Sequence, residues 1–380
     1  MKAVVAKADL LALIGKIQSI VSHKPAIPVL ANILIEAIDD QIILNATDLT
    51  TSMRCFCEAK VIEEGAVALP GRRFFQLARE LTAPQIKISC PQNDIAEITA
   101  GSSVFKINGV NKSEFPTLTN LANASQIPLS AAVLKEMLTK TAFSAAREDS
   151  RHVLNGIFVQ ILDKKASFIS TDGKRLAKVH TEIDLDPSFQ GSYILPLKAV
   201  EEMIKMLDEN SSRTSLNLMR DKVCLENSNV VLITKLLSGQ YPDVERVIPE
   251  STPIKVNLHR EELISLLRQV ALFTSEACGS IRFVFTEGQL DLIAVNSDIG
   301  EGNVNMPVDY KGDKLEVAFN PFYFLDILRH SKDETVTFAI QDAYNPGVIT
   351  DSSTAKFVIM PMRLQEPAVA ANVSEKPAFA

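Results

Sequence analysis

The chain has 380 residues, 46% of them hydrophobic and 22% charged, and a formal net charge of -7 at pH 7. These values exclude a fibrous or wholly disordered chain and leave room for two to four domains. The acidic balance argues against a general affinity for nucleic acid, because most duplex-binding proteins are basic overall.

Apolar residues at helical spacing predict six helices in three pairs: 7–21 and 72–81, then 130–147 and 198–207, then 258–270 and 321–332. Runs rich in Val, Ile and Phe lie between the helices of each pair and predict strands, as at 33–38, 156–162 and 281–285. The second helix of each pair follows Leu69-Pro70, Leu195-Pro196 or Phe319-Asn320, at offsets of 126 and 124 residues. The sequence therefore predicts an α+β fold with three tandem copies of one unit, in which two helices pack on antiparallel sheet.

Proline-bearing stretches at 116–128 and 249–253 indicate the joints between the copies. We expect domains at 1–122, 128–250 and 254–364. Residues 365–380 lack periodicity and are expected to form a disordered tail, or alternatively a peptide that docks on its own protein.

The sequence contains no Gly-rich phosphate loop and no cluster with metal-ligand spacing. The five scattered cysteines are Cys55, Cys57, Cys90, Cys224 and Cys278, and they are expected to be reduced thiols. No window has the roughly 18 apolar residues of a membrane span and no signal-peptide pattern opens the chain, so a cytoplasmic protein without a membrane partner is expected.

Three aspartates are the best catalytic candidates, because Asp48, Asp172 and Asp298 each follow a predicted strand at equivalent positions of the repeat. A turn whose Asp bonds its own backbone explains the same pattern. A fold constraint must recur in every copy, whereas an active site need appear only once. The sequence therefore predicts a protein that is not an enzyme and has no cofactor or metal, with an enzyme that uses these acids as a rival.

The predicted helices hold the positive charge. Together they carry a net +6, which leaves -13 for the rest of the chain. If they share one surface, that surface attracts phosphates without reading bases. Ordinary solvated helix faces are the alternative.

The residues resemble a known family, the bacterial sliding clamp, which is the beta subunit of DNA polymerase III. The match runs from Met1 to Leu364 and is carried by 25–30 (PAIPVL), 154–156 (LNG), 171–176 (TDGKRL), 241–243 (YPD), 246–249 (RVIP) and 360–364 (MPMRL). The resemblance implies clamp domains with sheets outside and helices inside, closed into a ring as a head-to-tail homodimer. It also implies a non-catalytic processivity factor for DNA replication, which encircles double-stranded DNA irrespective of its sequence. Implied protein partners are the polymerase III alpha subunit, the clamp loader, repair polymerases and other proteins with a clamp-binding motif.

The resemblance assigns a dimer interface and a partner cleft. It also adds Lys24 and Arg151 to the cations of the predicted helices as a DNA-facing set. The dimer interface would use Phe105 and Ile107 of one copy against Leu272 and Phe273 of the other, although all four could instead be core residues of their own domains. A hydrophobic cleft for partner peptides would be lined by Leu154, Thr171, Gly173, Arg175, Leu176, Pro242, Arg246, Val247, Val358, Met360, Pro361 and Met362. Core packing alone would explain Leu176, Val247 and Val358 as well. The DNA-facing set is Lys24, Arg72, Arg73, Arg79, Lys135, Lys140, Arg147, Arg151, Lys198 and Lys205.

Three residues depart from the family pattern: Val153 and Lys174 at the expected cleft, and Glu148 beside Arg147 and Arg151 at the expected DNA-facing loop. We expect altered peptide preference from the first two and weaker DNA contact from the third. A monomeric repeat scaffold that binds only proteins is the second rival.

Overall fold

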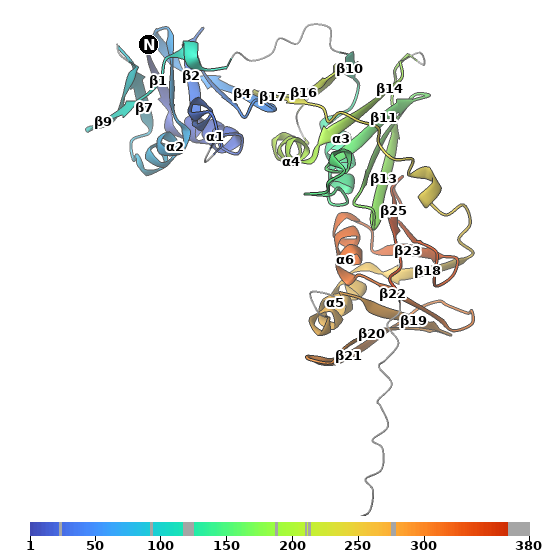
Figure 1. Cartoon of the computed structure of the whole chain (residues 1–380). Coiled ribbons are helices and arrows are strands. Elements are labelled where there is room, and N and C mark those ends of the chain that lie inside the picture. Colours follow the sequence, from blue (N-terminus) through green and yellow to red (C-terminus); the bar gives the residue numbers. More distant parts are fainter. Residues whose placement is uncertain are drawn as a thin grey trace, which may run out of the picture. The chain divides into compact units, whose positions relative to one another are not determined.

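The computed structural model describes residues 1–22, 25–91, 94–116, 125–186, 189–209, 211, 214–274 and 279–363 (Figure 1). The predicted tail, Lys24 and Cys278 lie outside these residues. The chain forms two compact units. Unit 1 comprises 1–172 and 178–241, and unit 2 comprises 173–177 and the chain from 242 onward.

Unit 1 contains two copies of one element order, in which β, α and η denote strands, α-helices and 3-10 helices. The first copy is β1 (Lys2–Ala6), α1 (Lys7–Ile17), η1 (Pro28–Ala31), β2 (Asn32–Ile38), β3 (Gln41–Thr47), β4 (Thr51–Glu58), β5 (Lys60–Glu63), β6 (Gly65–Pro70), α2 (Gly71–Glu80), β7 (Gln85–Ser89), β8 (Ile95–Ala100), β9 (Ser103–Asn108) and η2 (Lys112–Glu114). The second is β10 (Ser125–Ile127), α3 (Ala131–Ala142), η3 (His152–Leu154), β11 (Gly156–Leu162), β12 (Lys165–Thr171), β13 (Arg175–Glu182), β14 (Gly191–Pro196), α4 (Leu197–Met206), β15 (Thr214–Leu218), β16 (Lys222–Asn227) and β17 (Val230–Lys235). The first residues of β13, Arg175 to Ala177, belong to unit 2.

Unit 2 contains the third copy. It consists of η4 (Glu245–Val247), β18 (Ile254–His259), α5 (Arg260–Val270), η5 (Ala271–Phe273), β19 (Ile281–Thr286), β20 (Gln289–Asn296), β21 (Gly300–Pro307), β22 (Leu315–Phe319), α6 (Pro321–His330), β23 (Thr335–Ile340), β24 (Gly347–Thr350) and β25 (Lys356–Ile359). Each copy thus runs strand, helix, four or five strands, helix, three strands. The predicted three-copy α+β fold with two helices per copy is confirmed.

The sheets are antiparallel. In unit 1 the strand orders are β5-β1-β7-β8-β9 and β10-β15-β16-β17-β4-β3-β2-β6, with β14-β11-β12 as a third run. The second of these joins the two copies, because β17 pairs with β4 from Val230 opposite Cys55 to Thr234 opposite Thr51. Unit 2 has two sheets of its own strands. Their strand orders are β21-β20-β19-β22 and β25-β24-β23-β18. Alternating residues of such strands bury one face, and the helices cover it.

Two predicted helices were too long. The helix expected over 7–21 ends at Ile17, and the one expected over 130–147 ends at Ala142. Beyond each end the backbone tightens to three-residue turns, as where the Val21 N–H donates to the Gln18 carbonyl and the Ser144 N–H to the Thr141 carbonyl. The helices themselves carry net charges of +1, +2 and +1 for α1, α2 and α3 and zero for α4, α5 and α6. They are therefore less basic than the +6 predicted.

The core of unit 2 is aromatic. Phe324 of α6 stacks on Phe283 of β19 with ring centroids 4.7 Å apart, and Phe319 meets both rings edge-on. All three are fully buried, which stabilises the fold by up to about 3 kcal/mol for each ring. This packing fixes α6 on its sheet, and α6 carries part of the candidate site.

Candidate functional site

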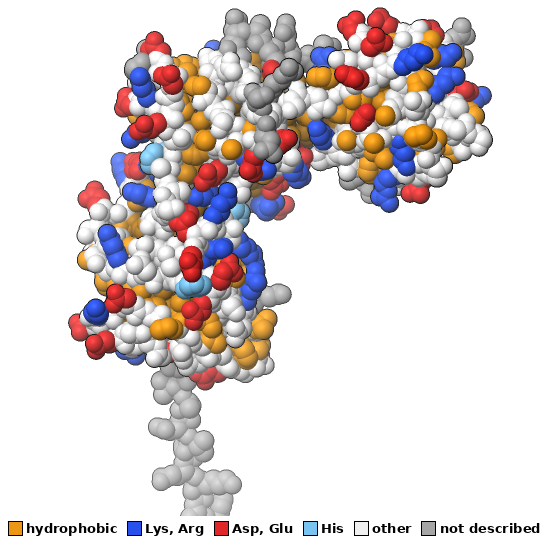
Figure 2. All heavy atoms as spheres, turned by 180° about the vertical axis from the view of Figure 1, so that it is seen from behind, with side chains coloured by type: hydrophobic (Ala, Val, Ile, Leu, Met, Phe, Trp, Pro, Cys, Tyr) orange, Lys and Arg blue, Asp and Glu red, His pale blue; other side chains and the backbone are white. Residues whose placement is uncertain are grey.

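The helices of unit 1 lie on one side of its sheets (Figure 1), so their cations are available to one surface. Most of those cations are already paired with an acid. The ion pairs are Lys135–Glu209 (3.2 Å), Lys140–Glu136 (3.2 Å), Arg147–Glu201 (2.9 Å), Arg151–Asp149 (2.9 Å), Lys198–Asp48 (2.6 Å) and Lys205–Glu202 (2.8 Å). Arg79 lies 4.0 Å from Glu80. On the face of the molecule that Figure 2 shows, Lys and Arg side chains are interspersed among Asp and Glu.

Three predicted DNA-facing residues differ from the rest. Lys140 does not fit the prediction, because its side chain is only 6% exposed and lies on the packed face of α3. Arg72 and Arg73, in contrast, are exposed in the first turn of α2, and neither forms an ion pair within the part of the chain that the structure describes. The first turn of a helix favours anions, since its backbone N–H groups have no partner within the helix.

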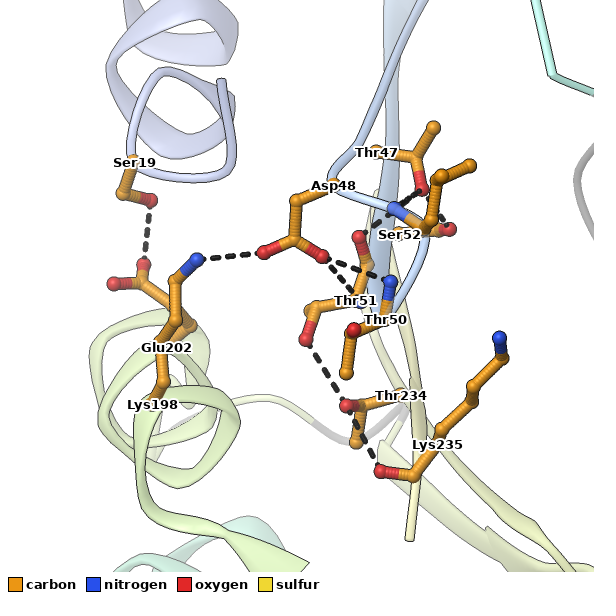
Figure 3. Close-up of polar contacts among 11 residues, drawn as sticks. Ser19, Thr47, Asp48, Thr50, Thr51, Ser52, Lys198, Glu202, Thr234 and Lys235 are labelled. Carbon is orange, nitrogen blue, oxygen red and sulfur yellow. Dashed lines mark hydrogen bonds and ion pairs between the residues drawn. The ribbon is translucent and has the colours of Figure 1, made fainter. Parts of the chain in front are cut away.

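Asp48 lies where the first two copies meet (Figure 3). Its Oδ1 accepts from the Thr50 and Thr51 N–H groups, at 3.0 and 2.7 Å, and its Oδ2 binds Lys198 of α4. Burial opposes ionisation of this carboxyl, but the hydrogen bonds from Lys198, Thr51 and Thr50 outweigh it, so the pKa of Asp48 is lowered.

Glu202 makes a second polar link across the same join (Figure 3). The Ser19 hydroxyl, which follows α1, donates to Glu202 Oε2 at 2.7 Å, while Lys205 binds Oε1. Thr51 and Thr234 share a buried hydroxyl hydrogen bond of 3.0 Å between β4 and β17. The join is therefore held by sheet pairing and by polar contacts, of which the Thr51–Thr234 bond is buried.

The loop after α3 is folded around Asp149. Arg151 binds this carboxylate through its backbone N–H, Nε and Nη2, and the Asn155 side chain bonds the Asp149 backbone on both sides. The side-chain and backbone hydrogen bonds from Arg151 lower the pKa of Asp149 to about 2. Glu148 is exposed in this loop, between Arg147 and Asp149.

The candidate dimer residues lie at two sheet edges. Strand β9 ends the five-stranded sheet of unit 1, and Phe105 on it is 41% exposed. Ile107 does not fit the prediction, because it is 8% exposed and packs inside its own domain. In unit 2, Leu272 is 74% exposed, whereas Phe273 is half-buried against Gly302 of the edge strand β21.

Sequence reasoning missed three exposed apolar residues near these edges: Val104 on β9, Val295 at the end of β20 and Ile299 in the turn before β21. Alternation along β9 could have revealed Val104. A hollow of about 1360 Å³ adjoins β9 and α2, and its lining includes Phe105, Lys106, Arg72 and Arg73.

Several of the predicted cleft residues come together in unit 2. The Met360 N–H donates to the Lys174 carbonyl at 2.9 Å, and the Met362 N–H donates to the Ala318 carbonyl at 2.8 Å. These bonds place the 360–362 segment beside 173–177 and the end of β22. Gly173 has a φ of +84°, which a residue without Cβ adopts most easily.

Arg175 is held by two residues of α6 that the sequence did not single out. Its Nη1 binds Asp326 Oδ2 at 2.6 Å, and its guanidinium lies 4.6 Å from the centre of the Tyr323 ring. Tyr323 and Asp326 are three residues apart and so share a helix face. That spacing was readable in the sequence, but a partner about 150 residues away was not.

The remaining cleft candidates divide by burial. Met360, Met362 and Val247 expose 39%, 36% and 39% of their surface, while Pro242 and Arg246 are exposed and Pro361 is half-buried. Leu176 and Val358 are core residues at 2% and 1%, so core packing accounts for them. In unit 1, Leu154 is buried, and the Thr171 N–H donates to the Tyr241 hydroxyl at 3.1 Å.

The rival hypothesis, an enzyme that uses the three aspartates, gains no support from the described residues. Asp48 closes a turn, and the Asp298 N–H donates to the Asn296 side chain in another turn. No group of three or more His, Cys, Asp or Glu among the described residues could hold a metal ion.

Burial raises the pKa of the free thiols of Cys55 and Cys224 to about 12. No helix in the described part of the chain is long and apolar enough to cross a membrane.

Three family models match the chain in tandem. They describe the N-terminal, central and C-terminal domains of the DNA polymerase III beta subunit and cover residues 1–119, 128–243 and 245–363. Similar proteins include the beta sliding clamp of Chlamydia pneumoniae, 51% identical over 96% of this chain and 100% of that protein, and that of Escherichia coli, 30% identical over 96% and 100%.

Solved structures give the same result. A DNA polymerase sliding clamp from Pseudomonas aeruginosa matches with a TM-score of 0.89 at 25% identity, covering 96% of this chain and 100% of that one. A sliding clamp from Bartonella birtlesii bound to griselimycin matches with a TM-score of 0.89 at 28% identity, with the same coverage.

Proposed function

The chain belongs to the family of DNA polymerase III beta subunits, the beta sliding clamps, and from this premise we propose that it closes around duplex DNA as a homodimeric ring and tethers DNA-processing proteins to it. The single observation that carries the proposal is the threefold repeat, each copy with two helices on one side of its sheets. Two such chains supply six similar domains, and a two-fold pair with two identical joints closes without free ends. This function requires no catalysis and no cofactor, and it places the protein in the cytoplasm with the replicating DNA.

The proposed joint pairs β9 of one copy with the region of β21 and η5 of the other. Both strands are sheet edges, and pairing satisfies backbone groups that would otherwise invite aggregation. Exposed apolar side chains are present on both sides: Val104 and Phe105 on β9, and Leu272, Val295 and Ile299 on unit 2. We expect Leu272 or a neighbour to enter the hollow beside Phe105.

The proposed partner site is the surface around Met360 and Met362, next to Arg175. Methionine side chains adapt to several related peptides, and Arg175 is held in place by Asp326 and Tyr323. Partners would be the polymerase III alpha subunit, the clamp loader and repair polymerases, through short clamp-binding motifs. Val153 and Lys174 tune which peptides bind best.

The mechanism relies on topology. A closed ring stays on DNA because it must open to leave, so its phosphate contacts can be weak enough to permit sliding. A docked polymerase remains at high effective concentration near the template, and its release does not end synthesis. Because the sequence has no nucleotide-binding loop, opening and loading fall to a separate ATPase.

The test is retention of the loaded full-length chain on a nicked circular plasmid. We expect retention on the circle and prompt loss after a restriction enzyme linearises it, with a native mass of twice 41.7 kDa. A monomer that leaves both DNA forms equally fast would support the protein-only scaffold instead.

A further inference from the structure

We propose that four ion pairs on the helix side of unit 1 form an exchange surface for DNA phosphates, in which each Lys or Arg leaves its carboxylate for a passing phosphate and then returns. The pairs are Arg147–Glu201, Arg151–Asp149, Lys198–Asp48 and Lys205–Glu202. This inference rests on the proposed function and specifies how the ring meets DNA.

The first support is an asymmetry of exposure. In all four pairs the cation is the outer partner, with 60–77% of its side chain exposed, while the acid keeps only 10–36%. Long Lys and Arg stems move easily while their heads stay in water. A phosphate that approaches from solvent therefore reaches the cation before it meets the carboxylate.

The second support is that three of the acids stay hydrogen-bonded when the cation leaves. Asp48 keeps the Thr50 and Thr51 N–H groups, and Glu202 keeps the Ser19 hydroxyl (Figure 3). Asp149 keeps the backbone N–H of Arg151, at 2.8 Å. At these three pairs, exchange thus leaves no carboxylate without a donor, which would otherwise oppose it. The fourth acid, Glu201, has 36% of its side chain exposed, so water can solvate it when Arg147 leaves.

The energies of the two states are close. An ion pair whose cation is exposed to water contributes little net stability, and the phosphate contact that replaces it is of the same charge-assisted kind. Each exchange therefore adds little net affinity and creates no deep minimum along the DNA. Arg72 and Arg73 differ, because they have no ion pair to break within the described chain and so attract phosphates at all times.

The experiment uses the full-length double variant Glu201→Gln/Asp149→Asn, which neutralises the partners of Arg147 and Arg151. A matched control, Glu114→Gln/Asp163→Asn, removes the same two charges at exposed acids that form no ion pair among the described residues. Asp163 has a φ of +49°, a conformation that Asn tolerates. Glu201→Gln alone guards against misfolding of the Asp149 loop, and thermal unfolding checks all variants.

We measure affinity for a short linear duplex across a salt titration. The double variant should bind several-fold more tightly than the control at low salt, and its log–log salt slope should steepen by about 0.9 for each freed cation. Equal affinities and slopes for the folded variant and the control would overturn the exchange surface. If the wild-type chain fails to stay on circular DNA, the proposed function falls, and the exchange surface falls with it.

Discussion

At the scale of single residues, Asp48 contributes to the contact between the first two copies. Its carboxylate closes its own turn and also binds Lys198 of the next copy. We expect Asp48→Asn to lower the free energy of unfolding by about 0.5–1 kcal/mol at pH 7, because Asn still caps the turn but loses the ion pair. The folded pKa is lowered, so this stabilisation is present above the unfolded pKa of about 3.9 and is lost as the pH falls through the folded value.

Urea unfolding at neutral pH and again below pH 3 checks this sign. The difference between wild type and Asp48→Asn should shrink at the lower pH. Asp298→Asn, at the equivalent position of the third copy, is the control and should have a smaller effect, because no ion pair of Asp298 is found within the described residues. A difference that grows in acid would refute the assignment.

Burial of individual residues was only partly predictable. Lys140 follows Met137 by three residues, so helical spacing already placed it on the packed face, yet its charge suggested a solvent position. Ion pairs between distant residues were beyond prediction, as for Arg147 and Glu201, which are 54 residues apart and meet only once α3 packs on α4. A charge count over helices therefore predicted a basic surface where the fold builds a largely compensated one.

At the scale of elements, periodicity predicted the six α-helices of the described chain but not all of their ends, and it missed the short 3-10 helices η1 to η5. Ile20 and Val21 are buried beyond the end of α1, so their apolar character extended the predicted helix into a turn. Sheet edges were harder still. Strand order depends on pairings such as β4 with β17, which no local pattern encodes.

A substitution in the proposed partner site and one in the proposed dimer joint should each impair only the binding that its own surface mediates. Met362→Asp should weaken binding of a peptide with the polymerase III alpha-subunit clamp motif at least about tenfold and leave the dimer intact, because its backbone bond to Ala318 remains. Leu272→Asp should do the opposite, since it places a charge on an apolar surface that is 74% exposed in the single chain. Fluorescence anisotropy with the peptide and sedimentation of both variants measure this. Loss of both properties in either variant would mean that the surfaces are not separate.

At the scale of the whole molecule, the repeat was predictable because similar offsets, of 126 and 124 residues, recur along the chain. The family was recognisable from the resemblance of short motifs such as 171–176 and 360–364. The net charge of -7 was not a guide to the charge of the proposed DNA surface. What matters is which cations lack a nearby acid, and within the described chain Arg72 and Arg73 in α2 stand out in this respect.

Arg72 and Arg73, unpaired within the described chain, allow the affinity for DNA to be tested separately from the retention of a closed ring on DNA. Arg72→Ala/Arg73→Ala should weaken binding to a short linear duplex about tenfold at low salt, with a salt slope shallower by up to about 0.9 for each lost contact. Sedimentation first checks that this variant still forms the dimer, because Arg72 and Arg73 also line the hollow beside Phe105. In the intact dimer the lifetime of the loaded ring on a nicked circle should hardly change, because escape requires opening a dimer joint. Leu272→Asp is the matched opposite, with duplex contacts intact and retention lost. If the arginine variant instead leaves the circle as fast as it leaves linear DNA, phosphate affinity holds the protein on DNA and the ring mechanism is wrong.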